Sequence, residues 1–459
     1  MHLNVTTQAC PAPLFEWMWR HPDDRTATGY RSLRYWQELA RQLESACVDA
    51  LFFADVHGVY DTYEGSWAPA VRHGVQVPAI DPLLVIPAAA AATEHLGFAV
   101  TYSTTYHPPY QCARVFSSLD HLTEGRIAWN IVTSYLGSAA ANGLGDRLEH
   151  DRRYDRAEEY LAVVRALWER SWEDGAVVLD RDRAVFGDAA RVHDIDHRGE
   201  WFRVRGPHQC EPSPQRTPVL YQAGASSRGL DFAARHAEVV FVTLPAPRRG
   251  GEQVADLRRR VRDCGRDPAS VKVLQGIQVM VGATEQEARA QAELYESLTL
   301  PDALLAKWCG WSGVDLAAFP PETPLSELRV EGVRTAVSFL QEIDRSRAWT
   351  VADAREVLGT PHRPTPRTAL FGTPARIAER MEEWMSRADV DGFNLFPCPP
   401  SRGMDDVAAL LVPELQRRGM FRRAYAPEER TLRERYFGAG RARCAPAPGA
   451  ERAGAGRPS

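Results

Sequence analysis

The sequence predicts an α/β protein whose parallel strands close into a (β/α)8 barrel, also called a TIM barrel. Short β-branched or aromatic runs alternate with longer amphipathic runs along most of the chain. Strict alternation of this kind is typical of a parallel sheet, and about eight strand–helix pairs predict a closed barrel. The length of 459 residues is one that a barrel with insertions reaches as a single unit.

The individual elements follow from these runs. Apolar residues at helical spacing predict helices over 33–46, 82–94, 109–122 and 150–172. The expected strands are 2–7, 50–55, 96–103, 126–134, 218–223, 238–243, 271–282 and 392–397.

Two stretches interrupt the alternation, and we interpret them as insertions after the fourth and seventh strand–helix units. Residues 173–215 contain turn signals and the hairpin-like run HRGEWFRVRG. Residues 283–370 are mostly helical with proline-rich joints, and we expect them to cover one mouth of the barrel. We therefore predict a single domain over residues 1–440. The tail 441–459, rich in Ala, Gly, Pro and Arg, is predicted to be disordered.

Composition excludes several classes of protein. The net charge of −5 offers no basic surface for nucleic acid. The longest apolar run, residues 83–92, is too short to span a bilayer, and the N-terminus lacks the order of a signal peptide. The eight cysteines contain no CxxC pair, which favours free thiols in a reducing compartment. We therefore expect a cytoplasmic protein that binds neither nucleic acid nor membrane.

Polar side chains gather where the predicted strands end. Each strand is apolar until its last one or two residues, and the C-terminal ends of parallel strands meet on one face of a barrel. Helix capping and loop hydrogen bonding are an equally good interpretation of any single residue, but four such ends in succession indicate a shared polar site. The residues are Asp55, then Thr101, Ser103 and Thr104, then Asn130, Thr133 and Ser134, then Gly224, Ser226 and Ser227.

The loop that follows the fifth strand, QAGASSRG at 222–229, favours a phosphate. Glycines allow a ligand to approach the backbone, and Ser226 or Ser227 stands where a helix begins, near free N–H groups and a positive dipole end. An ordinary serine cap is the alternative. A hydrolase nucleophile elbow would need glycine where Arg228 stands.

Other ligand motifs are weaker. There is no phosphate-binding GxxxxGK[ST] loop, and GLGDRL at 143–148 lacks the third glycine of a dinucleotide fingerprint. The run HDIDH at 193–197 is more typical of a solvated loop than of a metal site. We therefore predict no metal.

The segments 96–134, 149–172 and 218–229 together resemble the bacterial-luciferase-like flavin monooxygenases. The resemblance runs from about residue 1 to residue 440 and is strongest to the branch of nitrilotriacetate, EDTA and dibenzothiophene-sulfone monooxygenases and pristinamycin synthase subunits. It implies a TIM barrel that binds reduced FMN (FMNH2) non-covalently and receives it from a separate NAD(P)H:flavin reductase. It also implies a homodimer or homotetramer.

The resemblance also implies which residues hold the flavin. Asp55 and Asn130 would lie near the isoalloxazine edge, and Tyr154, Ser226 and Ser227 would hold the phosphate. The complete set of implied flavin residues is Asp55, Thr101 or Ser103, Asn130, His150, Tyr154, Ser226 and Ser227.

The implied reaction uses O2 as co-substrate and transfers one oxygen atom to a small organic molecule through a C4a-(hydro)peroxide of the flavin. His21 and His57 are candidate proton donors or acceptors, because imidazole titrates near neutrality. The loop 136–146 lacks the aromatic residue expected after Asn142, so the pocket wall differs there. Two alternatives stay open: a deazaflavin-dependent oxidoreductase of the same superfamily and a flavin-binding barrel without catalytic activity.

Overall fold

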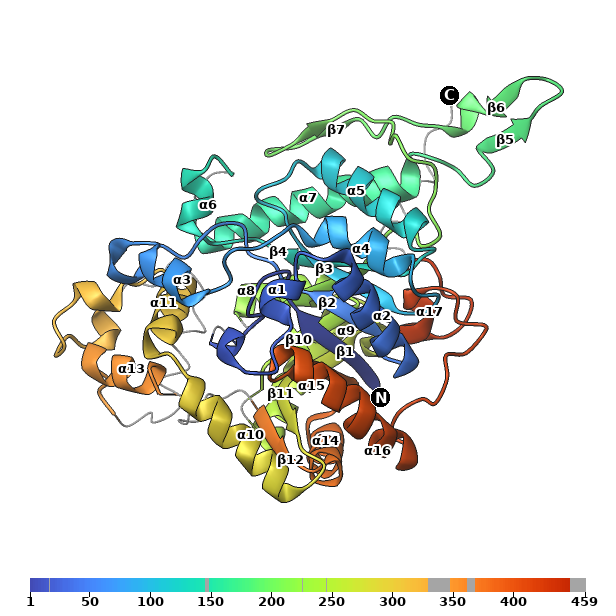
Figure 1. The fold of residues 1–459 in the computed structure, drawn as a ribbon. Helices are drawn as coiled ribbons and strands as arrows, with labels where there is room; N and C mark the ends of the chain where they lie inside the picture. The colour runs from blue at the N-terminus through green and yellow to red at the C-terminus, as the bar shows by residue number, and fades with distance from the viewer. Residues whose placement is uncertain are drawn as a thin grey trace.

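The computed structural model describes residues 1–15, 17–144, 148–224, 226–244, 246–328, 347–360 and 368–445. Eight parallel strands form a closed ring at its centre (Figure 1). In ring order they are β10 (Val239–Val242), β9 (Val219–Ala223), β4 (Ile127–Val132), β3 (Gly97–Ser103), β2 (Ala50–Phe53), β1 (His2–Thr7), β13 (Gly392–Pro397) and β11 (Lys272–Val281), and β11 pairs with β10 to close the ring. The predicted eight-stranded barrel is confirmed, and all eight predicted strands form.

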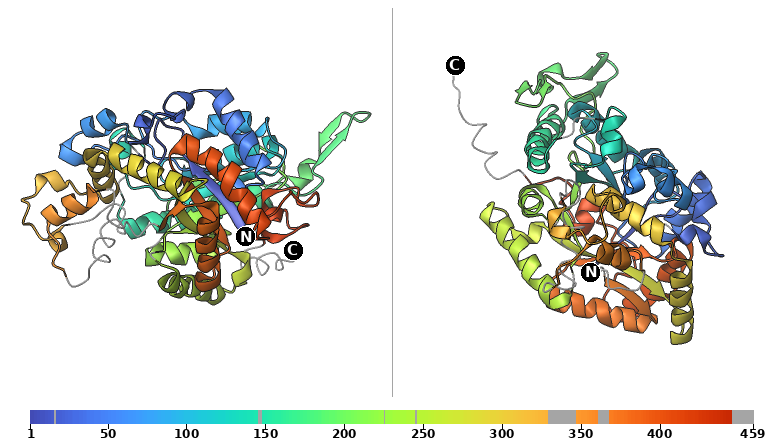
Figure 2. Two further views of the ribbon diagram at one scale, coloured as in Figure 1. Left: turned by 60° about the horizontal axis from the view of Figure 1, so that its bottom comes forward. Right: turned by 90° about the vertical axis from the view of Figure 1, so that its left-hand side faces the viewer.

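A layer of helices surrounds the ring (Figure 2). Proline in the first turn begins five of these helices, where its missing N–H costs nothing. In chain order the layer consists of α2 (Leu33–Ser45), α4 (Pro82–Ala90), α5 (Pro109–Leu122), α7 (His150–Arg170), α8 (Ser227–His236), α9 (Pro247–Asp263), α14 (Pro374–Ala388) and α15 (Pro400–Asp406), which continues through a π-helical turn, η7 (Val407–Leu411), into α16 (Val412–Arg417).

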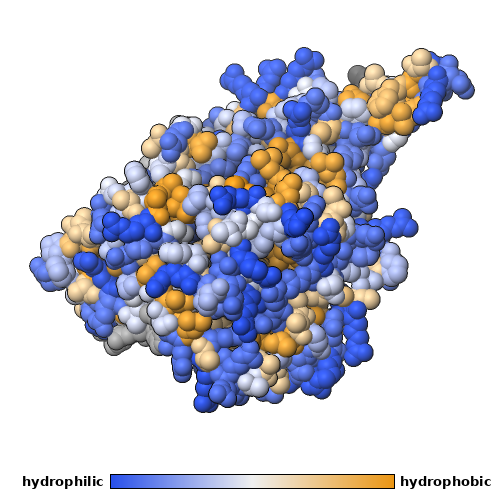
Figure 3. Space-filling model, viewed as in Figure 1, coloured by the Kyte–Doolittle hydropathy of each residue, from blue (hydrophilic) through white to orange (hydrophobic). Residues whose placement is uncertain are grey.

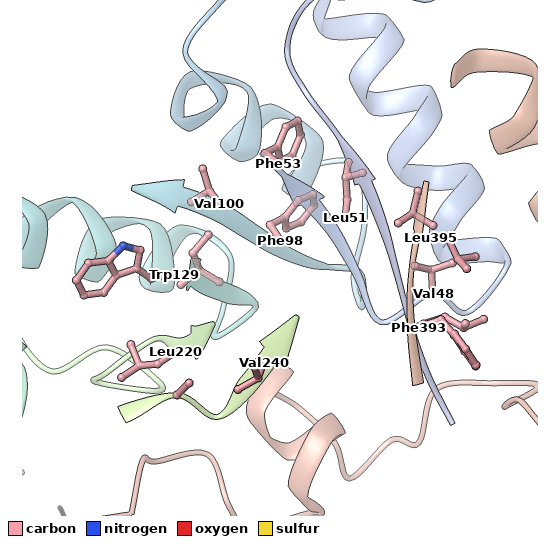
Figure 4. Packing of buried hydrophobic residues seen from close by; sticks show 14 of the residues in the cluster. Val48, Leu51, Phe53, Phe98, Val100, Trp129, Leu220, Val240, Phe393 and Leu395 are labelled. Carbon is pink, nitrogen blue, oxygen red and sulfur yellow. The ribbon is translucent and has the colours of Figure 1, made fainter. Parts of the chain in front are cut away.

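The strands alternate between two faces. Outward-facing side chains such as Phe53, Phe98, Trp129 and Leu220 pack against the helices in the largest hydrophobic cluster (Figure 4). Inward-facing residues such as Phe52 form a smaller cluster that fills the barrel. The inner cluster comprises Ala50, Phe52, Ala99, Ala128, Val219, Tyr221, Val239, Phe241, Leu274, Leu432 and Tyr436.

The N-terminal end of the barrel is closed by helix α17 (Leu432–Phe437). Leu432 lies against Gly97, the first residue of β3, where a Cβ would come within 2.6 Å of the leucine. The Tyr436 hydroxyl donates to Asn4 Oδ1 at 2.9 Å and lies 2.5 Å from the Tyr221 hydroxyl. A ligand is therefore expected at the opposite end, where the strands finish.

The first insertion lies between α7 and β9. It contains two antiparallel pairs, β5 (Val177–Asp180) with β6 (Val185–Gly187), and β7 (His197–Arg198) with β8 (Arg203–Val204). The second pair is the hairpin expected in HRGEWFRVRG. The β5–β6 hairpin projects from the molecule and exposes apolar side chains along its strands (Figure 3), with Leu179 61% and Phe186 64% exposed.

The second insertion begins at the end of β11 and precedes α14. It contains α10 (Glu285–Leu298), α11 (Pro301–Ser312), α13 (Val351–Leu358) and a strand that was not predicted, β12 (Thr368–Gly372), which extends the sheet along the C-terminal half of β11. Residues 329–346 and 361–367 of the predicted insertion lie outside the described residues.

Shorter helices occupy the loops and the insertions: η1 (Met18–Arg20), α1 (Thr26–Gly29), η2 (Tyr63–Gly65), α3 (Ala68–His73), α6 (Gly137–Ala141), η3 (Ala189–Arg191), η4 (Pro268–Ser270), η5 (Leu316–Ala318) and η6 (Leu325–Glu327). Helix α11 packs beside α3 (Figure 1). The Trp311 indole N–H donates to the Tyr60 hydroxyl at 2.8 Å, and this hydroxyl donates to Gln76 Oε1 at 2.9 Å. These bonds fasten the insertion to the loop after β2, at the C-terminal end of the barrel.

Part of the predicted tail is held against the barrel. Arg443 makes two bonds of 2.7 and 2.8 Å with the Asp174 carboxylate, and the Ala442 carbonyl accepts from Arg433 at 2.7 Å. Residues 446–459 lie outside the described residues.

Candidate active site

The polar strand ends lie on four neighbouring strands, β2, β3, β4 and β9, which make up one half of the barrel mouth. Thr101 on β3 is paired in register with Asn130 on β4, and Ile131 is paired with Gln222 on β9. The Asn130 amide donates to Thr101 Oγ1 at 2.9 Å. The structure therefore brings together, on one rim, side chains that are far apart in the chain.

Asn130 carries an unsatisfied acceptor. Its side chain is inward-facing by the alternation of β4 and only 3% exposed, yet Oδ1 has no hydrogen-bond partner among the described residues. A buried polar atom without a partner costs about 1–3 kcal/mol. Such an atom at the mouth of a barrel is explained when a bound ligand supplies the missing N–H donor.

Ser103 organises the loops that follow β3 and β4. Its Oγ accepts the Ser134 hydroxyl at 2.7 Å and the backbone N–H of Thr105 at 3.1 Å. The carbonyl of Ser134 in turn accepts from the Arg153 guanidinium on α7. The Ser103 hydroxyl oxygen thus stabilises the loops that follow β3 and β4.

Asp55 follows β2 and is the ionisable group at this rim. Burial raises the pKa of Asp55 to about 6, the negative charge of Asp81 acts in the same direction, and His57 opposes both. The His57 Nδ1 lies 3.7 Å from Asp55 Oδ2. The carboxyl therefore changes its protonation state near neutral pH, where it is able to hold or release a proton.

A second imidazole, His107, stands behind His57 and was not singled out from the sequence. Its ring stacks on Tyr102 with centroids 4.0 Å apart and meets His57 edge-on at 5.3 Å. Burial lowers the pKa of His107 to about 4, and His57 adds to the effect, so His107 is neutral at physiological pH. Its position shortly after β3, in the segment STTYHPP, is the sequence feature that could have marked His107 as a residue of the site.

The starts of α7 and α8 form the other part of the site. Ser226 caps α8, because its Oγ accepts the Gly229 N–H at 3.1 Å. The Tyr154 hydroxyl bonds to Ser226 and Thr133, which partly offsets the rise in the pKa of Tyr154 that burial causes. A Cβ on Gly229 would lie 2.9 Å from the Tyr154 hydroxyl, so glycine is required for this close approach.

The remaining predicted phosphate and helix residues lie nearby. The rings of His150 and Tyr154 are 5.4 Å apart on one face of α7, as their spacing indicated. His150 Nδ1 lies 2.7 Å from the Asp151 carboxylate. Ser227 is the first residue of α8, and its Oγ lies 3.4 Å from the Arg260 guanidinium.

His21 lies apart from this cluster, in the loop between β1 and α2. Its Nδ1 accepts the Asp23 N–H at 3.1 Å, and its charged neighbours are Asp23, Asp24 and Arg402. Among the described residues, no hydrogen bond or ion pair joins His21 to Asp55 or Asn130. His57 lies beside Asp55 on the polar rim, whereas the described contacts of His21 are with Asp23, Asp24 and Arg402.

The side chains of HDIDH point to separate partners on the first insertion and α7. His193 pairs with Glu173 at 2.8 Å, and His197 pairs with Glu159 at 3.0 Å. Asp194 accepts from Arg205 at 2.7 Å. Each of these side chains thus has its own partner, and no group of three or more His, Cys, Asp or Glu side chains that could hold a metal ion occurs within the described ranges.

Two further observations concern the protein's environment. Among the described residues, which include all eight cysteines, no disulfide forms. None of the helices formed by the described residues combines the length and apolar character that a membrane span requires.

Comparison with known proteins places this geometry in a family. Residues 16–391 match the family described as luciferase-like monooxygenase. The chain is 42% identical over 438 residues to dimethyl-sulfide monooxygenase of Hyphomicrobium sulfonivorans, covering 95% of this chain and 90% of the relative. It is 37% identical over 430 residues to nitrilotriacetate monooxygenase component A of Aminobacter aminovorans, covering 91% and 92%.

Among solved structures, riboflavin lyase with modified FMN and its substrate riboflavin superposes with a TM-score of 0.89 at 33% identity, covering 97% of both chains. The match to nitrilotriacetate monooxygenase confirms the branch that the sequence resembled. The chain belongs to the luciferase-like monooxygenase family, a class of oxidoreductases that incorporate oxygen into their substrates.

Proposed function

We propose that the chain is the oxygenase component of a two-component system that uses FMNH2 and O2 to oxygenate a small organic molecule. The observation that carries the proposal is the unsatisfied Oδ1 of Asn130, a buried acceptor on the rim that also holds Asp55 and the N-terminus of α8. Reduced FMN has the matching groups: ring N–H donors at one end and a phosphate at the other.

The residues present fit this cofactor. Asn130 Oδ1 would accept a ring N–H, with Thr101 holding the amide in place through its 2.9 Å bond. Ser226, Ser227 and Tyr154 would hold the phosphate at the start of α8, where the helix dipole favours an anion. His150 completes the α7 side of this cradle.

A bound flavin would supply the oxygen chemistry, and the protein would supply position, dryness and proton control. The insertion and the loop after β2, joined at Tyr60 and Trp311, would help to exclude water from the mouth. Asp55, with His57 beside it, would hold a proton at Oδ2 and exchange it with solvent through the partly exposed imidazole.

The partner and assembly are part of the same proposal. A relative that is named component A supports a separate flavin reductase as the source of FMNH2. A homodimer or homotetramer would show a mass of two or four times 51.2 kDa in light scattering after size exclusion.

Anaerobic titration with FMNH2 followed by rapid mixing with O2 tests the proposed function. We expect saturable binding and then a transient absorbance of oxygenated flavin that decays faster when substrate is present. Binding of a deazaflavin without any reaction with oxygen would favour a deazaflavin-dependent oxidoreductase instead. Flavin binding with no transient would favour a barrel without catalytic activity.

The Asn130→Ala variant provides the matching test of the site. Loss of one hydrogen bond of about 0.5–1.5 kcal/mol should weaken FMNH2 binding roughly 2- to 10-fold. Unchanged affinity would contradict the placement of Asn130 against the flavin.

A further inference from the structure

The half of the barrel mouth opposite the polar rim carries an apolar cluster. It is formed by β10, β11, β13 and β1, the four ring strands that do not carry the polar cluster. Gln278 on β11 is paired in register with Phe396 on β13, and both belong to the inward-facing set, because their neighbours Val279 and Leu395 belong to the outer cluster. Met280 follows on the same face of β11.

The loop after β1 and the second insertion complete this apolar wall. Phe15, Trp17 and Met18 pack with Met280 and Cys398 in one buried cluster. From the insertion, the Tyr295 ring lies 5.3 Å from the ring of Trp17. The partly buried members of the cluster are Leu14, Tyr295, Leu298, Leu300, Leu304 and Phe396.

Among the described residues, the members of the wall carry no charged side chain. Two cations at its margin donate to backbone carbonyls of the wall: the Lys307 ammonium to Leu14 at 2.7 Å and the Arg20 guanidinium to Leu298 at 2.6 Å. A carboxylate packed on the apolar side chains would lose its hydration, which is costly unless it displaced one of these two bonds. The wall therefore favours an uncharged occupant.

Two hydrogen-bond donors on the wall lack a strong acceptor. Trp17 is 3% exposed, and its Nε1 has no partner among the described residues. The Nε2 of Gln278 is likewise buried, and its described neighbour is the Cys398 sulfur, a weak acceptor. Buried N–H groups are nearly always paired, so an acceptor from a ligand is the expected complement.

We propose that this wall is the substrate side of the mouth and that the substrate is a small, uncharged, mainly apolar molecule with one hydrogen-bond acceptor. The acceptor is received by the Trp17 indole N–H and the Gln278 amide, and the rest of the molecule packs on Phe15, Met280 and Phe396. The inference rests on the proposed function, because it takes the polar half of the mouth as the flavin side.

Three related probes test the proposal: diethyl sulfide, diethyl sulfoxide and (ethylthio)acetate. Their dissociation constants are measured on the FMN-loaded protein from the perturbation of flavin absorbance. We expect both uncharged probes to bind more tightly than the carboxylate. The Trp17→Phe variant, which removes the N–H and keeps an aromatic ring, should weaken sulfoxide binding about five-fold, the value of one hydrogen bond of about 1 kcal/mol, and leave sulfide binding unchanged.

Trp172→Phe is the matched control, because the Trp172 indole N–H already donates to the His208 carbonyl at 2.8 Å, within the first insertion. This variant should leave the affinities of all three probes unchanged. Gln278→Met removes the second donor at similar volume and serves as a second variant if Trp17→Phe does not fold. It should also weaken only the sulfoxide.

Two results would overturn the proposal: tighter binding of (ethylthio)acetate to the unmodified protein than of the uncharged probes, or equal effects of Trp17→Phe on sulfide and sulfoxide. FMN affinity is measured separately on each variant. If FMN does not bind at all, the proposed function fails, and the probes are then titrated against the flavin-free protein by tryptophan fluorescence, which still tests the wall.

Discussion

Replacing Asp55 with asparagine should make the protein more stable at neutral pH while impairing its site. The raised pKa means that ionising this carboxyl costs more in the folded than in the unfolded chain. A rise from 3.8 to about 6 corresponds to about 3 kcal/mol at 1.36 kcal/mol per pH unit. Asparagine has nearly the same shape and carries no charge, so the Asp55→Asn variant is freed of this cost.

Because the pKa of Asp55 is raised in the folded protein, the free energy of unfolding falls as the pH rises. The cost is absent below pH 3.8, grows as pH rises towards 6, and is complete above it. The gain of Asp55→Asn should therefore be about 3 kcal/mol at pH 7.5 and about half of that at pH 5. With an unfolding entropy of about 1 kcal/mol/K for a chain of this size, the midpoint of thermal unfolding rises by about 3 °C at pH 7.5.

The assay is differential scanning fluorimetry of both proteins from pH 4.5 to 8, with FMN affinity measured alongside. Asp405→Asn provides the control, because the Asp405 side chain is 45% exposed and paired with Arg25 at the surface. Its effect on the midpoint should be small. A gain for Asp55→Asn that is the same at every pH, or a loss of stability at pH 7.5, would show that the pKa of Asp55 is not raised in the folded protein.

Three further predictions concern other parts of the structure. Ser226→Ala should lower stability by about 1 kcal/mol and also weaken FMN binding, whereas Thr284→Ala, which removes the equivalent cap of α10, should cost similar stability with unchanged FMN affinity in fluorescence titration. His57→Gln removes the group that opposes the rise in the pKa of Asp55, so the pH at which the Asp55→Asn gain reaches its plateau should move upward; no movement would contradict the contact. Tyr436→Phe removes the hydroxyl that donates to Asn4 Oδ1 and contacts the Tyr221 hydroxyl at the closed end of the barrel, and should cost about 1–3 kcal/mol in urea unfolding without any change in FMN affinity.

Local patterns were sufficient to predict the barrel. Each ring strand is a short apolar run with turn residues at its end, and the parallel arrangement follows from the helices between them. The same logic located Asp55, Thr101, Asn130 and Ser226, because the ends of parallel strands meet at one mouth. These features depend on residues that are close in sequence.

What the sequence did not reveal depends on contacts between distant segments. Strand β12 is a five-residue run next to a proline-rich joint, and it becomes a strand through the free edge of β11. His107 acquires its place from Tyr102 and His57, and His21 is held by the Asp23 N–H beside Arg402 of α15. The placement of the polar cluster and the apolar cluster on opposite sides of the mouth becomes visible only when the ring order of the strands is known.

A crystal structure of the protein with FMN is the most direct test of the central idea, that four adjacent strand ends and the start of α8 form one flavin cradle. We expect the phosphate within hydrogen-bond distance of the Ser226 hydroxyl and the ring system against Asn130 Oδ1 and Asp55. Density for the ring system on the β11–β13 side, or a phosphate away from α8, would contradict it.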